Sequence, residues 1–374
     1  MLDIVIVGGG LGGLAAAIAF RRAGHSVEVI EASPGPTFNE LGAAIGCPPN
    51  AVRILDSFGI TKESIRGVEY AGITSLSHKG GAGFSASFGD IKGQYGSDWR
   101  LCHRVDIHQA LQNLAFGERG VGSPVKLNLG VKAVLWDPSL ETLALNSGEV
   151  RKPDLLIAAD GINSILRSHI IGENVVASST GVACYRWLVD AEKMKGNPEL
   201  DWVIKEGPSG PRLVLSSDGR VLFLYPCRDG TIINAMGIHM DDRDQNQVGF
   251  HVPSTRASLL EKFNDFGSQY HQFMNLTNEE DGREDTVGLW QLRSMPGLST
   301  WINGRACLLG DAAHAMLPTI GQGAAMAFED AITLAILIPA NTPREQVPDR
   351  LKAYETLRKD VLISLRRSRW RDWL

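Results

Sequence analysis

The stretch that decides the fold is the N-terminal run Ile4-Val5-Ile6-Val7-Gly8-Gly9-Gly10-Leu11-Gly12-Gly13. Four consecutive β-branched apolar residues predict a buried strand, and the alanine-rich segment after the glycines predicts a helix. The glycines fit the spacing G-x-G-x-x-G at Gly8, Gly10 and Gly13. In such a unit the first glycine permits a tight turn, the second lets the backbone approach a pyrophosphate, and the third lets the helix pack closely on the strand. The N-terminus of the helix then offers unpaired N–H groups to the phosphates.

A second predicted strand, SVEVIE, ends in an acid at the place where a dinucleotide site needs one. Glu31 lies 23 residues after Gly8. A carboxylate there accepts hydrogen bonds from the ribose 2′- and 3′-hydroxyls and repels a 2′-phosphate. The motif therefore predicts FAD or NAD rather than NADP, and it does not by itself separate the first two.

Composition narrows the class of protein. The chain has 374 residues, of which 44% are hydrophobic and 21% charged, as is typical of a soluble globular protein. The net charge of −5 provides no electrostatic footprint for nucleic acid. No basic segment precedes the N-terminal apolar run and no other apolar run is long enough for a membrane span, so a cytoplasmic location is expected. The five cysteines form no C-x-x-C pair, and no metal site is expected.

The texture of the chain changes twice. Residues 1–177 alternate short β-rich runs with helical stretches, which is typical of a parallel α/β sheet. Residues 178–290 contain strand-like runs separated by Asp218-Gly219 and Asp229-Gly230, a strong hairpin signal. Residues 291–374 return to the α/β texture and finish in a predicted C-terminal helix. We therefore predict a Rossmann-type dinucleotide-binding domain in two parts, with an inserted, mostly antiparallel β-sheet domain that binds the substrate.

Two further predicted strands also end in acids. One leads into Asp160-Gly161, and the other leads into Gly310-Asp311. Carboxylates at the carboxyl ends of parallel strands point into the crevice where open α/β sheets bind ligands. Asp311 is thereby suited to accept hydrogen bonds from a sugar or ribityl hydroxyl. A glycine-containing turn follows, and a helix beginning near Gly323 would direct its positive dipole end at an anionic ring.

In this order and spacing the motifs resemble the group A flavoprotein monooxygenases, the single-component FAD-dependent aromatic hydroxylases. The similarity is greatest to the salicylate-hydroxylase-like branch, which includes fungal natural-product hydroxylases. It extends over nearly the whole chain and includes residues 40–45, 101–111 and 301–305. The resemblance implies an FAD-binding domain of the glutathione-reductase and aromatic-hydroxylase kind. It also implies NAD(P)H as a co-substrate, and the lack of a second G-x-G-x-x-G in the chain agrees with transient binding of that nicotinamide donor.

The resemblance also assigns FAD contacts residue by residue. The glycine motif matches the pyrophosphate site, Glu31 the ribose ligand and Asp311 the ribityl ligand. Arg104 matches an arginine near the phosphates, and Asp160 matches an acid associated with both FAD and NAD(P)H. The segment that often reads Gly-Ala-Gly-Ile in relatives has Ala44 as its third residue here. The residues implied to contact FAD are Gly8, Gly10, Gly13, Glu31, Ala44, Arg104, Asp160, Asp311, Pro318, Gly321 and Gly323.

The implied reaction hydroxylates a phenolic or otherwise electron-rich aromatic small molecule. NAD(P)H reduces FAD, the reduced flavin forms a C4a-hydroperoxide with O₂, and its distal oxygen passes to the substrate. A cationic or hydrogen-bonding residue near the substrate hydroxyl would favour the reactive phenolate. Similarity to fungal hydroxylases points to Arg186 and Tyr225 for this task. Strand alternation does not decide which face of a sheet either residue occupies, so a surface arginine and a core tyrosine remain the alternative.

Other functions fit parts of the pattern. A flavin oxidase would keep every FAD-binding motif, and so would an inactive flavin-binding partner protein. A halogenase would need a Trp-x-Trp-x-Ile-Pro segment that the chain lacks, and an NAD-dependent dehydrogenase leaves the Gly310-Asp311 motif unexplained. His314 is expected to support the flavin loop rather than act as a general base. Cys47 is expected to be a small apolar filler, with a covalent flavin link as the alternative. The sequence does not distinguish a monomer from a homodimer.

Overall fold

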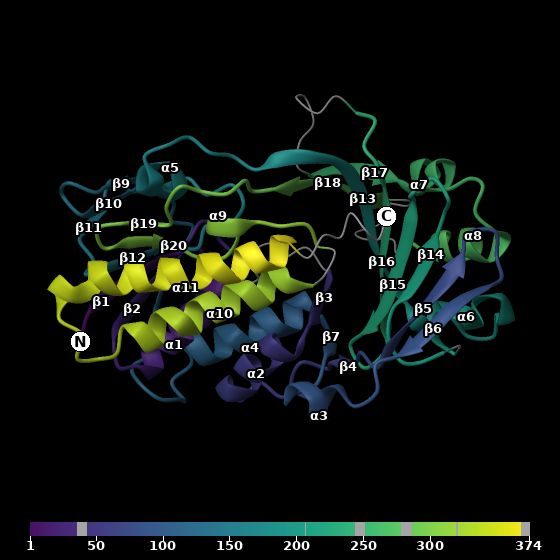
Figure 1. Ribbon diagram of the computed structural model, residues 1–374, viewed down its shortest axis with the longest axis horizontal. Coiled ribbons are helices and arrows are strands. Elements are labelled where there is room, and N and C mark those ends of the chain that lie inside the picture. Colours follow the sequence, from purple (N-terminus) through teal and green to yellow (C-terminus); the bar gives the residue numbers. More distant parts are fainter. Residues whose placement is uncertain (36–42, 206, 244–250, 278–285, 319–320, 368–374) are drawn as a thin grey trace. The chain divides into compact units, whose positions relative to one another are not determined.

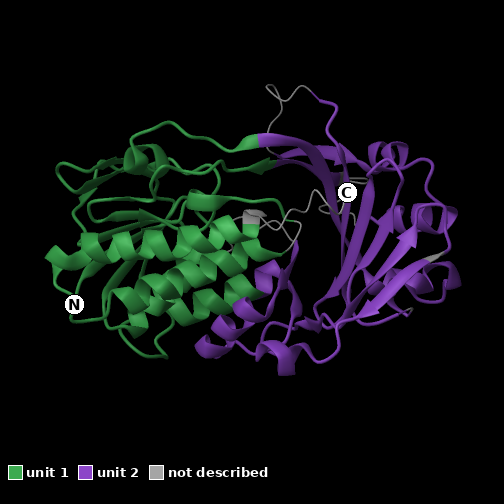
Figure 2. Ribbon diagram, in the orientation of Figure 1, with its two compact units in different colours: residues 1–40, 107–178, 293–374 green, residues 41–106, 179–292 purple. Residues whose placement is uncertain are grey.

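The computed structural model describes residues 1–35, 43–205, 207–243, 251–277, 286–318 and 321–367. The chain divides into two compact units, coloured separately in Figure 2. The first unit comprises residues 1–40, 107–178 and 293–374, and the second comprises residues 41–106 and 179–292. Each unit has its own sheet, helices and buried core.

The first unit is built on a six-stranded sheet with the order β19-β20-β12-β1-β2-β8. The predicted first strand, β1, lies inside this sheet and pairs in parallel with β2 and β12. Its apolar residues are buried, as a continuous Ile/Val run requires when both faces of a strand are covered. The strands are β1 (Asp3–Val7), β2 (Ser26–Glu31), β8 (Lys126–Leu129), β12 (Leu155–Ala158), β19 (Ile302–Asn303) and β20 (Ala306–Leu308).

Helices and a small separate sheet complete the first unit (Figure 1). Helix α1 follows the glycine motif and packs closely on α10, because a Cβ at Gly12 would lie 3.0 Å from the Cβ of Ala327. The helices are α1 (Leu11–Arg22), α4 (Arg104–Phe116), α5 (Leu166–Ile171), α9 (Asp311–His314), α10 (Gln322–Leu337), η3 (Arg344–Gln346) and α11 (Val347–Arg367). The small sheet consists of β9 (Ala133–Asp137), β10 (Thr142–Leu145) and β11 (Val150–Arg151).

The second unit is built on an eight-stranded sheet with the order β17-β18-β13-β16-β15-β14-β5-β6. The predicted hairpins are present, with Gly219 and Gly230 at positive φ between β14, β15 and β16. The strands are β5 (Gly72–Ser77), β6 (Ala82–Ser87), β13 (Ser178–Asp190), β14 (Arg212–Leu215), β15 (Val221–Cys227), β16 (Ile232–Met240), β17 (His251–Thr255) and β18 (Thr286–Ser294).

One face of this sheet is covered by helices. Alternate residues of β13, β15 and β16 pack with Phe263, Tyr270 and Phe273 in a buried cluster. The helices of the unit are α2 (Pro49–Phe58), α3 (Ile91–Tyr95), η1 (Ala191–Met194), η2 (Pro198–Leu200), α6 (Asp201–Ile204), α7 (Arg256–Lys262) and α8 (Ser268–Met274). A three-stranded sheet is formed by β3 (Ala44–Cys47), β4 (Val68–Glu69) and β7 (Arg100–His103).

The division of the chain differs from the predicted boundaries in one respect. Residues 41–106 were expected in the dinucleotide-binding part, 1–177, but they group with the eight-stranded sheet. The physical reason is strand pairing: β5 joins β14 in parallel, with Thr74 opposite Arg212, and β6 then forms the edge of the sheet. The other divisions between the two units fall at residues 178–179 and 292–293.

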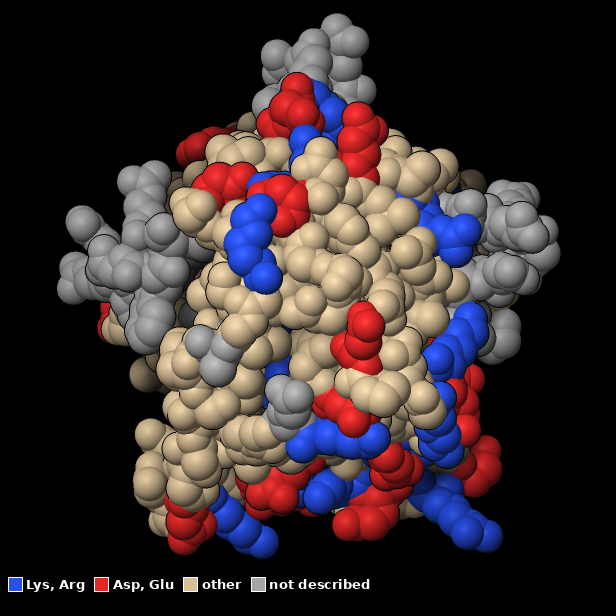
Figure 3. Space-filling view, turned by 90° about the vertical axis from the view of Figure 1, so that its right-hand side faces the viewer, with Lys and Arg blue, Asp and Glu red and all other residues tan. Residues whose placement is uncertain are grey.

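The surface carries mixed charge. On the face drawn in Figure 3, acidic and basic side chains of the described residues are interspersed over a largely uncharged surface. Among the described residues, no helix is both long and apolar enough to cross a bilayer. The expected cytoplasmic location stays a prediction.

Candidate functional site

The glycine motif adopts a backbone that only glycine accommodates. Gly8 has φ +106°, and a Cβ there would lie 2.3 Å from the carbonyl oxygen of Ala159. A Cβ at Gly13 would lie 2.0 Å from the carbonyl oxygen of Gly8, so its absence lets α1 pack against the end of β1. A Cβ at Gly10 would have no atom within 4 Å, and this position therefore faces open space. The loop thus has the close backbone approach that a pyrophosphate needs, at the N-terminus of α1.

Glu31 lies directly beside this loop. One carboxylate oxygen, Oε2, accepts a hydrogen bond of 2.7 Å from the Gly9 backbone N–H, and Oε1 accepts another of 2.7 Å from the Ser33 N–H. The Glu31 carboxylate, at the end of β2, is therefore oriented by backbone N–H groups, one of which belongs to the glycine loop. A ribose held by Glu31 would lie next to the glycine loop, as a dinucleotide requires.

His108 holds the same loop from α4. Its buried Nε2 lies 2.8 Å from the carbonyl oxygen of Gly9, and because a carbonyl only accepts, the ring must donate. Sequence reasoning assigned His108 no role. The sequence feature that could have indicated a role is its spacing of four residues from Arg104, because residues four apart lie on the same face of a helix.

The predicted flavin contacts Ala44 and Arg104 come from neighbouring backbone in the second unit. The Arg104 N–H donates to the Ala43 carbonyl oxygen at 2.9 Å where α4 begins. The Ala44 N–H donates to Asn234 Oδ1 at 3.0 Å. Cys47, on the same strand as Ala44, is buried, and its thiol interacts with that of Cys102, whose pKa is raised by this neighbour and by burial. Contact of Ala44 and Arg104 with FAD stays a prediction.

Asp160 serves as a helix cap. Its Oδ1 accepts a hydrogen bond of 2.6 Å from the Ser164 hydroxyl, and its Oδ2 accepts bonds of 2.9 Å and 3.2 Å from the backbone N–H groups of Ile165 and Leu166. Burial raises the pKa of this carboxyl more than the hydrogen bonds lower it. Both oxygens are thus engaged at the start of α5, which favours a positioning role for Asp160 over direct proton transfer.

Asp311 follows β20, the strand that pairs with β12, and Asp160 follows β12. It is exposed at the first residue of α9, directly after Gly310, which has φ +62°. Strands β12 and β20 pair in parallel, so their carboxyl ends meet at the same edge of the sheet. An exposed carboxylate at that edge is available for a ligand hydroxyl.

Arg167 joins the loops that follow these two strands. Its guanidinium donates to the carbonyl oxygens of Gly161, Ile162 and Ala312, at 3.2 Å, 2.9 Å and 2.7 Å respectively. The side chain is buried, and desolvation lowers its pKa although the nearby Asp160 and Asp311 oppose this shift. The sequence shows Arg167 only as a residue following Asp160, because its partners in the second loop lie far along the chain.

His314 belongs to a buried charged network. Its Nε2 lies 2.6 Å from Asp330 Oδ2, and the same oxygen accepts a 3.1 Å bond from the Gly310 N–H. Arg358 Nε donates to Asp330 Oδ1 at 2.7 Å. Burial alone would raise the pKa of Asp330, but His314 and Arg358 lower it. The network ties the loop before α9 to α10 and α11, which fits the supporting role expected for His314.

The turn before α10 contains the remaining predicted flavin contacts. Pro318 is exposed, and Gly321 adopts a left-handed φ of +65° as the residue that precedes the helix. The helix begins at Gln322, so Gly323 lies in its first turn rather than at its start. Among the described residues, a Cβ at Gly323 would have no atom within 4 Å. This glycine therefore has space beside it in the first turn of α10, as Gly10 has before α1.

Arg186 and Tyr225 occupy the same face of the eight-stranded sheet, the one opposite α7 and α8. Their neighbours along the strands, such as Trp187 and Leu224, belong to the buried cluster under the helices. The opposite face, called the second face below, carries Arg186 (β13), Phe223 and Tyr225 (β15), Asn234 and Met236 (β16) and Trp290 (β18). The structure thus puts Arg186 and Tyr225 on one side of the sheet, and their contact with a substrate stays a prediction.

The two side chains differ in environment. Tyr225 is 6% exposed, and burial raises the pKa of its hydroxyl far above the usual range, although Arg186 acts in the opposite direction. The guanidinium of Arg186 lies 5.3 Å from the ring centroid of Trp290, which in turn stacks on His251 at 4.3 Å. The Arg186 Nε is buried without a hydrogen-bond partner among the described atoms. The second face therefore combines a cation, a neutral phenol and planar rings.

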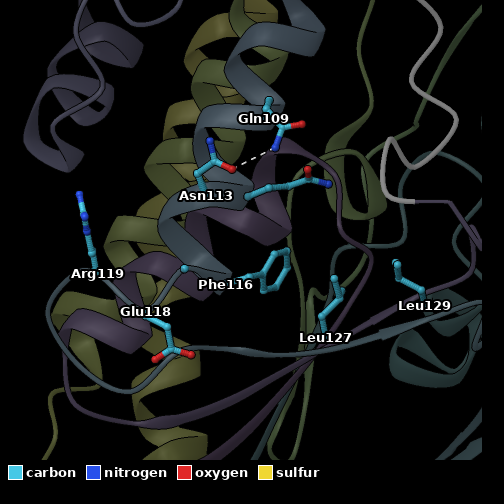
Figure 4. A pocket seen from close by; sticks show the side chains of 9 residues that line it. Gln109, Asn113, Phe116, Glu118, Arg119, Leu127 and Leu129 are labelled. Atoms are coloured by element: carbon cyan, nitrogen blue, oxygen red, sulfur yellow. Dashed lines mark hydrogen bonds between the residues drawn. The ribbon is translucent and has the colours of Figure 1, made fainter.

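A separate cavity of about 650 Å³ lies in the first unit, between α4 and the edge strand β8 (Figure 4). Its lining combines the apolar side chains of Phe116, Leu127 and Leu129 with amides, including Gln109, which donates to Asn113 at 3.0 Å. None of its lining residues is among those predicted for FAD or substrate, so we assign this cavity no function.

Comparisons with known proteins identify the family of this chain. The family model described as FAD binding domain matches residues 1–367. Hispidin-3-hydroxylase of Neonothopanus nambi is 38% identical over 96% of this chain and 85% of its own length. Salicylate hydroxylase of Pseudomonas putida is 29% identical over 99% of this chain and 85% of its own length. The crystal structure of CtdE in complex with FAD and a substrate has the same fold, with a TM-score of 0.81 and 22% identity over 97% of this chain and 87% of that one.

Proposed function

This chain belongs to the FAD-binding domain family and is an FAD-dependent monooxygenase of the aromatic-hydroxylase type, and we propose that it uses NAD(P)H and O₂ to hydroxylate a phenolic small molecule. The two relatives named above are hydroxylases of hispidin and of salicylate by their names. Both of those compounds carry an aromatic ring with a hydroxyl group. A phenol is accordingly the substrate class that the family relationship favours.

The residues present fit FAD. The glycine loop allows close backbone approach at Gly10, Glu31 lies beside it, and Asp311 and Gly323 are open to a ligand. When bound, FAD supplies the redox chemistry, which in this proposal is reduction by NAD(P)H and oxygen transfer by the C4a-hydroperoxide route expected above. The chain's own task is then to hold the cofactor, to keep Asp160 and Asp311 in place through Arg167, and to orient the phenol.

The observation that carries the proposal is the shared face of Arg186 and Tyr225. A cation near a phenol stabilises its ionised form and lowers its pKa, typically by about 1–3 units. The ionised form is the more electron-rich ring, and it is the one that attacks an electrophilic oxygen. Arg186, held against Trp290, would provide the positive charge, and the Tyr225 hydroxyl would hydrogen-bond the phenolate oxygen. Without a positively charged side chain on this face, the substrate would remain the less reactive neutral phenol.

A panel of phenols tests this function. Purified protein loaded with FAD would be mixed with NADH or NADPH and with hispidin, salicylate or resorcinol, and NAD(P)H oxidation and O₂ consumption would be followed together, with benzoate as the control that lacks a phenolic hydroxyl. We expect at least one phenol to stimulate both, with one atom from ¹⁸O₂ found in the product. Stimulated O₂ consumption that yields only hydrogen peroxide would instead identify an oxidase. An unstimulated reaction with every phenol would contradict the proposal.

A further inference from the structure

Asn234 stands at the centre of the second face. It lies on β16, directly opposite Leu188 of β13 on one side and Tyr225 of β15 on the other. Directly opposed residues of antiparallel strands share a face, so the amide lies beside the Tyr225 ring. The side chain is only 2% exposed. A buried amide in this position must find hydrogen-bond partners for both of its ends.

One end of the amide has such a partner. Asn234 Oδ1 accepts the 3.0 Å hydrogen bond from the Ala44 N–H. Because a backbone N–H can only donate, the atom facing Ala44 must be the oxygen, and the orientation of the amide is thereby determined. The NH₂ group is therefore presented on the other side in a known orientation.

The other end has none. Within the described residues, Asn234 Nδ2 is buried and has no hydrogen-bond acceptor. Leaving a buried donor unpaired costs more free energy than the paired group contributes, so such a group is usually matched by a ligand or an ordered water. Arg186 Nε is a second unpartnered donor on the same face. An oxygen-bearing molecule bound at this face would supply acceptors for both donors.

We propose that Asn234 is a substrate-binding residue whose Nδ2 donates a hydrogen bond to an oxygen atom of the phenol. This inference rests on the proposed function and adds a specificity element to it. Arg186 carries a charge and suits the ionised oxygen, whereas the neutral amide of Asn234 suits a second acceptor such as a ring carbonyl or another hydroxyl. The site would thus select phenols that carry at least two oxygen atoms.

The Asn234→Asp variant separates the two ends of the amide. Aspartate has nearly the same shape and keeps an oxygen for the Ala44 N–H, but at pH 8 it has no donor for the substrate. We expect normal FAD content and a lower melting temperature of the loaded protein, because the new carboxylate lies in a site that is only 2% exposed. The dissociation constant for hispidin, measured from the change in flavin absorbance without NAD(P)H, should rise about tenfold or more, the equivalent of one lost hydrogen bond.

The chain offers a matched control. Asn146 is exposed, and its Oδ1 likewise accepts a 2.9 Å hydrogen bond from a backbone N–H, that of Lys132. Asn146→Asp adds the same charge at a position outside the second face, and both readouts should match the wild type. Asn234→Leu removes both ends of the amide and should lower FAD retention as well as hispidin affinity.

Three results would overturn the proposal or its premise. Wild-type hispidin affinity in Asn234→Asp with normal FAD content would mean that Nδ2 pairs with water rather than with substrate. Loss of FAD from Asn234→Asp would mean that the residue acts by positioning Ala44, and not as a donor. If the wild-type protein itself binds neither hispidin nor salicylate, the proposed function fails first, and that outcome is distinguishable because it requires no variant.

Discussion

The groups directed at a ligand in the first unit are mostly backbone atoms, whereas those on the second face of the eight-stranded sheet are side chains. In the first unit three acids already have backbone partners: Glu31 binds Gly9, Asp160 binds Ile165 just before α5, and Asp330 binds Gly310. On the second face, donors of Arg186 and Asn234 have no acceptor among the described residues. The three acids of the first unit are thus held by backbone N–H groups, whereas the second face offers side-chain donors to a ligand.

Because of this difference, we expect the two regions to affect different properties of the protein: the glycine loop its stability and FAD binding, and the second face its substrate specificity. Changes in the glycine loop or its supports should disturb the fold or FAD retention. Changes on the second face that keep the hydrogen bond between Asn234 and Ala44 should leave FAD retention intact and alter how the phenol binds and reacts. The predictions below test this separation and are ordered by the size of the expected effect.

The largest effect is expected for Gly13→Ala. The new Cβ would lie 2.0 Å from the Gly8 carbonyl oxygen, a clash with backbone that cannot be relieved by a side-chain rotation. We expect a loss of at least about 4 kcal/mol in the free energy of unfolding, measured by urea denaturation. Gly10→Ala is the control, since its Cβ meets no atom within 4 Å. It should fold normally and bind FAD more weakly, and equal stability of the two variants would contradict the assigned roles.

Asp330→Asn should have the next largest effect. The substitution removes the charge that His314 and Arg358 share in a fully buried site. Breaking a buried ion pair typically costs about 3 kcal/mol or more, because one charge is left uncompensated. Urea unfolding with and without FAD would measure the loss. FAD should bind less tightly as well, since Asp330 also holds the Gly310 N–H. A fully stable variant would mean that the network does not support this loop.

Arg186→Ala should leave the fold intact and make the bound phenol harder to ionise. Without the guanidinium, the pKa of a bound phenol should rise by about 1 unit or more, and turnover at neutral pH should fall by about tenfold. An absorbance titration of the enzyme–phenol complex would measure the pKa. Arg186→Lys keeps a positive charge and should show a smaller shift. Normal turnover in Arg186→Ala would refute the phenolate role.

Asp311→Ala should weaken FAD retention by a few-fold to about tenfold, as expected for the loss of one hydrogen bond to a ribityl hydroxyl. Equilibrium dialysis of the free cofactor would measure the dissociation constant. The exposed Asp349 of α11 provides a control, and Asp349→Ala should bind FAD as the wild type does. An unchanged dissociation constant in Asp311→Ala would remove this residue from the cofactor site.

The smallest effect concerns pH. The pKa of Asp330 is lowered in the folded protein, so its contribution to stability is fully present above the pKa of an unfolded aspartate, about 3.9, and is lost as the pH falls through the lower folded value. The stability difference between wild type and Asp330→Asn should therefore be constant from pH 8 to about pH 5 and narrow below about pH 4. Urea unfolding at a series of pH values would measure it. A difference that narrows near pH 6 would point to another group.

Local motifs were sufficient for much of the first unit. Gly8, Gly10 and Gly13 were predicted from spacing, and the structure places them in a strand–loop–helix because their backbone requirements are met by residues close in sequence. Glu31 could be predicted for the same reason, since it ends the next strand of the same unit. His108, Arg167 and Asp330 could not, because their partners are separated from them by tens of residues or lie on other elements.

The sequence by itself determined the dinucleotide-binding loop, the hairpins at Gly219 and Gly230, and membership of a family that binds FAD. These features depend on backbone conformation and on short-range hydrogen bonds, which residue types such as glycine specify directly. Only the tertiary structure decided that β5 and β6, from residues 41–106, join the eight-stranded sheet and that Arg186, Tyr225 and Asn234 share one of its faces. Those features depend on how distant strands pair and on which face of the sheet α7 and α8 cover. A shift of one residue in the pairing of a strand would have moved its side chains to the other face.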